Sequence, residues 1–125
     1  MRDLASKLIF EKTIIEGYGD GGFTINGQKM TGSVLVTVNE AILWDVSNVR
    51  DLNPDELLTI FAKIKNIGIL LIGTGAMSVY PDKGLVSYIK GLGMGVEFMD
   101  TGAACRTFNL LIEENRDVIA ALISL

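Results

Sequence analysis

Residues 67–75 read Ile-Gly-Ile-Leu-Leu-Ile-Gly-Thr-Gly, and residues 100–109 read Asp-Thr-Gly-Ala-Ala-Cys-Arg-Thr-Phe-Asn. Each stretch contains a glycine-bearing turn at the point where a buried strand is expected to end and a helix to begin. Such turns are typical of an α/β domain whose ligands bind above the carboxyl ends of its strands. These two stretches therefore predict an α/β fold and a possible pocket at the strand ends.

The second half of the chain alternates helices and strands. Asn53 can cap free amides and Pro54 suits the first turn, so a helix is expected from Asn53 to about Lys65. The apolar run 68–72 is too short for a helix and is expected to be a strand covered on both faces. This alternation indicates right-handed crossovers and parallel strands. The remaining expected elements are a helix at 81–90, a strand at 96–99, a helix at about 103–114 capped by Asp100 or Thr101, and a strand at 118–123.

The first half of the chain has the pattern of an antiparallel meander. Residues 8–15 are strand-like, 17–22 are expected to form a loop, and 23–25 lead into Asn26-Gly27. An Asn-Gly pair is favoured at type I′ hairpin turns because both positions need positive φ. The return arm is expected at 28–30, with further strands at 33–38 and 41–44.

Composition limits the protein to a few classes. The 125 residues, 49% of them hydrophobic, can build one well-buried core, so a single domain over residues 1–125 is expected. The longest apolar runs are far shorter than the roughly 18 residues of a membrane span, and the N-terminus lacks the apolar segment of a secretory signal. A cytoplasmic protein without a transmembrane segment is therefore expected, although peripheral membrane association stays possible.

Charge and residue usage argue against several functions. The net charge is −4 and the eleven Lys and Arg residues are scattered singly, which disfavours nucleic-acid binding. The chain has no His, so neither a Ser-His-Asp nor a Cys-His site can be assembled. Cys105 is the only cysteine and can form neither an internal disulfide nor a thiolate metal cluster. We accordingly assign no catalytic residue, no metal and no cofactor from the sequence.

The glycine-rich motifs also carry a resemblance. The segments 17–23 and 71–75, and above all Ala103-Ala104-Cys105-Arg106-Thr107-Phe108-Asn109, are similar to the Mth-type domain family. This family includes the mitochondrial respiratory complex I assembly factor 3 and an adipogenesis-associated mammalian protein. The resemblance implies a three-layer α/β fold with a mixed sheet, combining the N-terminal antiparallel meander with a C-terminal parallel βαβαβ part. It also implies protein partners, among them respiratory-chain subunits or assembly factors.

Two positions depart from the pattern of the bacterial and mitochondrial branch that the chain resembles. The segment 76–81 lacks the Arg and Phe expected there. Asn115 stands where Gly is expected before Arg116, a mild change because Asn tolerates the left-handed backbone conformation better than most residues.

Several motif residues are candidates for binding a small ligand, and each also has a structural interpretation. The turn 73–75 could offer backbone amides to an anion, or it could be a tight turn only. Cys105 lies near a helix start and beside Arg106, which favours a thiolate, yet cysteine is among the most often buried residues. Arg106 could bind a carboxylate or phosphate, or could pair within the protein. The full candidate set is Gly73, Thr74, Gly75, Asp100, Thr101, Cys105, Arg106 and Asn109.

Two functions stay open from the sequence. The first is a non-enzymatic protein-binding factor, for which the resemblance implies assistance in the assembly of respiratory complex I. Its aromatic residues could form a partner surface or could pack in the core; they are Phe10, Tyr18, Phe23 and Trp44. The alternative is a small-molecule or anion-binding protein, which could be an enzyme, with its pocket at 73–75 and 105–109. Self-association through a sheet edge or an apolar patch is also plausible.

Overall fold

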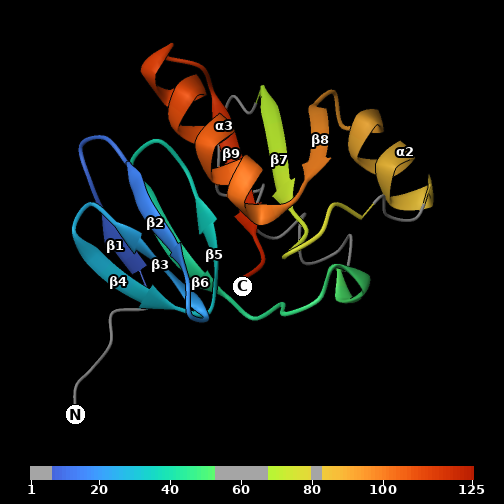
Figure 1. The fold of residues 1–125 in the computed structure, drawn as a ribbon. Helices are drawn as coiled ribbons and strands as arrows, with labels where there is room; N and C mark the ends of the chain where they lie inside the picture. The colour runs from blue at the N-terminus through green and yellow to red at the C-terminus, as the bar shows by residue number, and fades with distance from the viewer. Residues whose placement is uncertain (1–6, 53–67, 80–82) are drawn as a thin grey trace.

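A six-stranded mixed sheet forms the centre of the structure, a computed structural model that describes residues 7–52, 68–79 and 83–125 (Figure 1). The strand order is β1-β6-β5-β9-β7-β8, and a separate three-stranded sheet has the order β2-β3-β4. The helix predicted at 53–65 and the start of the one predicted at 81–90 lie outside the described residues. The described elements are β1 (Lys7–Ile9), β2 (Ile15–Gly19), β3 (Gly22–Ile25), β4 (Gln28–Thr31), β5 (Ser33–Val36), β6 (Glu40–Trp44), the 3-10 helix η1 (Val49–Asp51), β7 (Ile69–Gly73), α2 (Lys83–Gly91), β8 (Gly95–Met99), α3 (Thr101–Glu113) and β9 (Val118–Leu122).

Strand β9 joins the two halves of the six-stranded sheet. It pairs with β7 in parallel and with β5 antiparallel, while β8 lies parallel to β7 on the other side. The predicted parallel C-terminal part is therefore confirmed, and so is the mixed character of the sheet. Every residue of β9 is buried, as the apolar run at 118–123 predicted.

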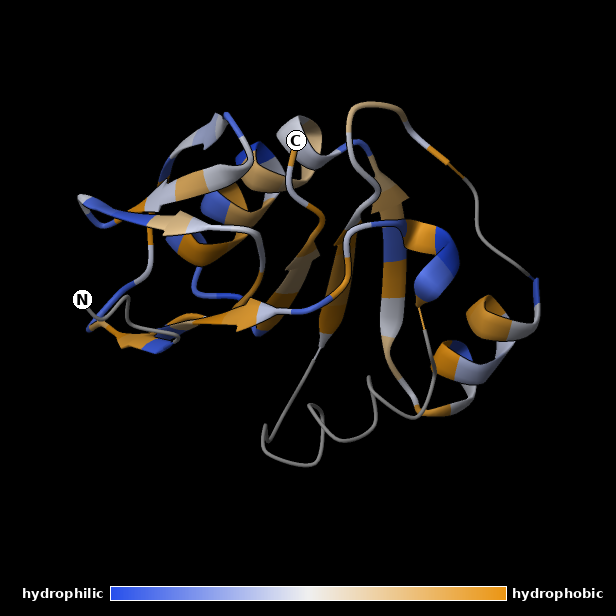
Figure 2. Cartoon of the chain, turned by 90° about the horizontal axis from the view of Figure 1, so that it is seen from below, coloured by the Kyte–Doolittle hydropathy of each residue, from blue (hydrophilic) through white to orange (hydrophobic). Residues whose placement is uncertain are grey.

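The side chains of this sheet alternate between two hydrophobic clusters, which makes the fold three-layered. Leu71 and Leu122 face a cluster completed by α3 and the small sheet, whereas Leu70 and Ile72 face one completed by α2 and η1. Because successive residues of a strand point to opposite faces of the sheet, one strand supplies side chains to both clusters. In Figure 2 the central strands are mostly in the hydrophobic colour, in keeping with cover on both faces.

Helix α3 begins where the sequence predicted. The backbone of Asp100 is extended, and its side chain accepts a hydrogen bond from the Ala103 amide at 2.9 Å. Asp100 is therefore the N-cap of α3. Figure 1 shows α3 crossing in front of β9 and β7, and its contacts with both strands are extensive. The motif at 100–109 is therefore the first two and a half turns of a helix packed on the middle of the sheet.

The N-terminal half confirms the meander and adds that it forms its own sheet. Asn26 and Gly27 both have positive φ, 48° and 80°, as a type I′ hairpin requires. Asn115 also takes the left-handed conformation expected of it, with φ at 59°.

Two expectations for this half were wrong. Residues 8–15 are not one strand, because the chain leaves the large sheet after Ile9 and enters the small one at Ile15. Residues 17–22 are not a loop, because Asp20 and Gly21 at φ 53° and 78° close a two-residue hairpin between β2 and β3. The strand expected at 33–38 is present but shorter, because it ends at Val36, before the turn to β6.

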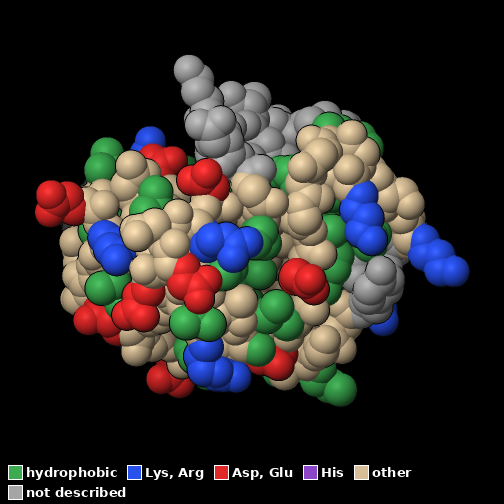
Figure 3. Space-filling view, turned by 90° about the horizontal axis from the view of Figure 1, so that it is seen from above, with side chains coloured by type: hydrophobic (Ala, Val, Ile, Leu, Met, Phe, Trp, Pro, Cys, Tyr) green, Lys and Arg blue, Asp and Glu red, His purple; other side chains and the backbone are tan. Residues whose placement is uncertain are grey.

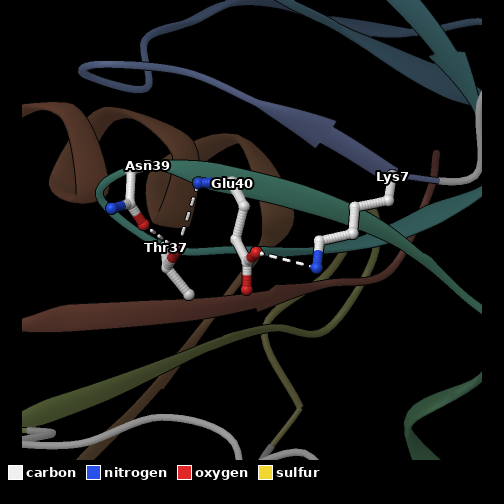
Figure 4. A network of polar contacts seen from close by, with 4 residues as sticks. All are labelled: Lys7, Thr37, Asn39 and Glu40. Carbon is white, nitrogen blue, oxygen red and sulfur yellow. Dashed lines mark hydrogen bonds and ion pairs between the residues drawn. The ribbon is translucent and has the colours of Figure 1, made fainter.

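Strand β1 lies at one edge of the large sheet and is held by a small polar network (Figure 4). Lys7 forms an ion pair with Glu40 at 3.2 Å, and the Glu40 amide donates to Thr37 Oγ1 at 3.2 Å. The hydroxyl of Thr37 in turn donates to Asn39 Oδ1 at 3.4 Å. A charged residue on a three-residue edge strand discourages pairing with another chain.

The surface mixes charges of both signs. On the face seen in Figure 3, Lys and Arg side chains lie interspersed with Asp and Glu rather than gathered in one basic patch. Among the residues that the structure describes, no helix is long and apolar enough to cross a membrane.

Candidate functional site

The carboxyl end of β7 lies against the first turn of α3 with no space between them. A Cβ placed on Gly73 would stand 3.0 Å from both the Cα and the Oγ1 of Thr101, and 3.1 Å from Leu122 Cδ2. Only glycine allows this approach without displacing backbone. The first glycine of the 73–75 turn therefore has a packing role between strand and helix.

Two buried threonines, Thr74 and Thr101, lie just after the carboxyl ends of β7 and β8. Thr101 is fully buried; its hydroxyl donates to the Ile123 carbonyl at 2.7 Å and accepts from the Gly75 amide at 2.9 Å. The Thr74 hydroxyl donates to the Met77 carbonyl at 2.6 Å and accepts from the Val79 amide at 3.1 Å. Gly75, at φ +101°, closes the turn. The Gly75 amide, one of those predicted to attract an anion, is thus already paired inside the protein.

Cys105 faces the interior of the protein. It is 2% exposed and belongs to the cluster between α3 and the sheet. Burial raises the pKa of the Cys105 thiol from 9.0 to about 12, and the neighbouring Arg106 charge offsets this only in part. The thiol is therefore protonated at neutral pH, which agrees with the structural interpretation of this residue rather than with an activated nucleophile.

Asn109 clamps the small sheet to α3. Its Nδ2 donates to the Ile15 carbonyl at 2.8 Å, and its Oδ1 accepts from the Ile15 amide at 3.0 Å. Ile15 begins β2 at a bulge in the β2–β3 pairing, where these backbone groups turn toward the helix. An amide side chain can satisfy both groups at once because it carries a donor and an acceptor.

Arg106 lies on the exposed side of α3 and bonds to a residue of the small sheet. Its Nη1 donates to the Tyr18 hydroxyl at 2.7 Å. The Tyr18 ring packs over the backbone of Gly102, where a Cβ would stand 2.7 Å from the phenol oxygen. Tyr18 stays 42% exposed. The pairing of Arg106 with an acid, one of the interpretations left open, is not seen among the described residues; its partner is a phenol.

A cavity of about 570 Å³ opens beside the 73–75 turn. Its buried floor contains Val49, Thr74 and Ile123, while Val79 and Leu125 on the rim are 39% and 38% exposed. Among the described lining residues, Arg50 is the only one with a charged side chain, and it has no ion pair within the described ranges. The remaining lining residues are Ser47, Asn48, Gly75, Ala76 and Ser124.

The structure divides the eight candidate residues among four environments. Thr74 and Gly75 line the cavity, whereas the other six do not. Gly73, Asp100 and Thr101 form the joint between β7 and α3, and Cys105 lies in the core. Arg106 and Asn109 both contact β2 on the opposite side of the sheet from η1. The cavity at the 73–75 turn is lined by none of the residues 105–109, and ligand binding by any of the eight candidates stays a prediction.

One functional candidate, Arg50, was missed in the sequence, and another, Tyr18, was named there only as one of four aromatic residues that could form a partner surface. Tyr18 was considered only with the other aromatics, of which Phe23 and Trp44 are buried and Phe10 packs against the core. Arg50 was passed over because an isolated arginine forms no recognisable pattern with its neighbours in the sequence. Neither residue carries a local signal, since each acquires its role from a partner or a cavity wall that is distant in sequence. Among the described residues, no group of three or more His, Cys, Asp or Glu lies close enough to hold a metal.

Comparison with known proteins gives concordant matches in sequence. A family model described as a protein of unknown function (DUF498/DUF598) matches residues 15–123. The chain is 36% identical over 113 residues to NADH dehydrogenase (ubiquinone) 1 alpha subcomplex assembly factor 3 of Xenopus tropicalis. That alignment covers 90% of this chain and 62% of the relative, so the chain spans about three fifths of the curated relative's length.

Solved structures share the same fold. An NMR structure of a Rhodopseudomonas palustris protein is 32% identical with a TM-score of 0.83, covering 99% of this chain and 90% of that one. A Bordetella pertussis protein described as an Mth938-like domain is 25% identical with a TM-score of 0.74, covering 98% and 90% of the two chains.

Proposed function

This chain belongs to the DUF498/DUF598 family of Mth938-like domains, and on that premise we propose that it is a non-enzymatic protein-binding factor. Its partners are proposed to be subunits of respiratory complex I or proteins that assemble it, in a cytoplasmic setting. The similarity to vertebrate assembly factor 3 supports this choice of client. The buried, protonated Cys105 and the lack of His support a role in binding rather than in catalysis.

The observation that carries the proposal is an exposed surface along α3. It is composed of Arg106 and Leu110 on the helix and of Tyr18 on the neighbouring strand β2. Arg106 and Leu110 are four residues apart and therefore lie on the same side of the helix. Leu110 is 56% exposed and lies in the last turn of a helix whose other side is packed. Tyrosine and arginine are the residue types most enriched at the centres of protein interfaces. We name this surface the α3 face.

The α3 face is also preorganised. The hydrogen bond from Arg106 and the contact with Gly102 hold the Tyr18 side chain in place before any partner arrives. Fixing such side chains in advance lowers the conformational entropy that binding would cost. A partner with a complementary apolar patch and a carbonyl or carboxylate group would contact Leu110 and the outer side of Arg106.

We would test this by affinity capture of the tagged protein from its native cells, with quantitative mass spectrometry and a mock-tag control. We expect enrichment of complex I subunits or their assembly proteins. Leu110→Asp should reduce that enrichment at least about tenfold, since an unpaired charge would face an apolar partner surface. The matched control is Leu92→Asp, because Leu92 is 43% exposed and lies just after the last residue of α2.

A second variant separates loss of contact from loss of fold. Gly102→Ala should displace the Tyr18 ring while keeping every side chain of the α3 face, and alanine is the better helix former. We expect unchanged circular dichroism and thermal stability but weakened capture. Capture that is equal for Leu110→Asp and Leu92→Asp, or no respiratory-chain protein above the mock control, would contradict the proposal.

A further inference from the structure

The cavity beside the 73–75 turn has apolar walls and one charged side chain, Arg50, as a ligand with an apolar body and a charged head group requires. Its apolar walls are Val49, Val79, Ile123 and Leu125, two of them buried and two at the rim. Its volume of about 570 Å³ falls within the range of small-molecule pockets, roughly 300–1,000 Å³. The site shares no residue with the α3 face.

The deep polar groups of the cavity are already satisfied by the protein. The Thr74 hydroxyl is engaged by Met77 and Val79, and the Gly75 amide by Thr101. A ligand gains no hydrogen bond from them, so the inner part of the cavity suits a hydrocarbon body. Burying apolar ligand surface against such walls is favourable in proportion to its area.

The charge of the cavity lies at its mouth. Arg50 is exposed, and its guanidinium has neither an ion pair nor a side-chain hydrogen bond within the described part of the chain. The Asn48 side chain caps η1 by accepting from the Arg50 amide, which fixes the backbone that carries this arginine. A guanidinium binds a carboxylate in a bidentate manner, more strongly than it binds a neutral group.

The location is consistent with ligand binding. The cavity lies outside the carboxyl ends of the parallel strands β7 and β9, where open α/β sheets usually bind their ligands. From these observations we propose that this cavity binds an aliphatic monocarboxylate, with the hydrocarbon chain against Val49, Val79 and Ile123 and the carboxylate on Arg50.

Three probes with one tail and different head groups test the proposal: decanoate, decanol and decylammonium. Binding is followed by isothermal titration calorimetry, with the fluorescence of Trp44 as a second readout, because this single tryptophan packs in the same cluster as Val49 and Ile123. We expect one saturable decanoate site per chain, weaker binding of decanol, and the weakest binding of decylammonium.

Variants locate the head and tail sites separately. Arg50→Gln should weaken decanoate about tenfold or more and leave decanol unchanged. Arg116→Gln is the matched control, because Arg116 is an exposed arginine outside the cavity. Ala76→Trp should block all three probes without disturbing the fold, since Ala76 is an exposed rim residue.

Three results would overturn the proposal. These are the lack of saturable decanoate binding, equal binding of decanoate and decanol to the unmodified protein, and decanoate affinity that survives Arg50→Gln or Ala76→Trp. Because none of these variants alters the α3 face, failure here leaves the capture experiment with partner proteins unaffected, and failure of that experiment leaves this one unaffected.

Discussion

The Cys105 thiol illustrates how residues of the 100–109 motif serve the fold. Its proximity to a helix start and to Arg106 favours a thiolate, but the desolvation that comes with full burial outweighs both effects. Sequence could place the thiol on a helix; it could not show which side of the helix faces the core. The same limit applies to Arg106, whose hydrogen-bond partner Tyr18 lies 88 residues away in the chain.

This burial predicts a specific dependence of stability on pH. The unfolded chain releases the Cys105 proton near pH 9.0, whereas the folded protein releases it near pH 12. Stability from this group is therefore complete below pH 9 and is lost as the pH rises from 9 toward 12. At pH 10 the expected loss is about 1.4 kcal/mol relative to pH 8.

Urea unfolding of the unmodified protein and of Cys105→Ala at both pH values measures this loss. Tyr and Lys titrations are common to both proteins and cancel in the difference between them. Cys105→Ala should therefore lose about 1.4 kcal/mol less between pH 8 and pH 10. Equal losses in the two proteins would show that the thiol reaches solvent without unfolding.

At the scale of elements, most of the fold could be predicted. The Asn-Gly hairpin, the parallel strands of the C-terminal half and the start of α3 each depend on local signals: positive φ, an apolar run and a capping aspartate. The division of the N-terminal strands between two sheets could not be predicted. One contact that holds the start of β2 comes from Asn109, which lies on another element and is distant in sequence.

Replacing Asn109 by aspartate tests this clamp. The new carboxylate could still accept from the Ile15 amide, but it would face the Ile15 carbonyl, which now accepts from Nδ2 at 2.8 Å. We expect a loss of about 3 kcal/mol in the free energy of unfolding at pH 7, since a buried acceptor is left beside a like partial charge. Amide exchange should quicken mainly in β2, β3 and β4.

The loss should also depend on pH with a defined sign. Facing a carbonyl raises the pKa of the new carboxyl, so its destabilising effect grows as the pH rises above about 4 and shrinks below it, where the protonated acid can donate. Urea unfolding at pH 4 and pH 7 checks this. Asn115→Asp makes the same chemical change at an exposed position and should leave both values nearly unchanged.

On the scale of the whole molecule, β9 connects the two parts of the large sheet. Without it, β1-β6-β5 and β7-β8 share no strand pairing, and both cores lose a wall. We therefore expect a chain ended after Asp117 to lack cooperative urea unfolding by circular dichroism and to elute as aggregates. A chain that keeps β9 but carries Leu125→Ala is the control and should unfold cooperatively. Cooperative unfolding of the shortened chain would mean that one part folds alone.

The position of β9 has a further consequence during synthesis, because the ribosome makes this strand after every other described element. Until it emerges, the backbone edges of β5 and β7 are both unpaired, and each carries a run of buried aliphatic residues. Such edges are the segments through which nascent chains aggregate, and pairings between distant parts of a sequence form slowly. Translation order thus leaves both edges exposed in the newborn protein until β9 is available to pair with them.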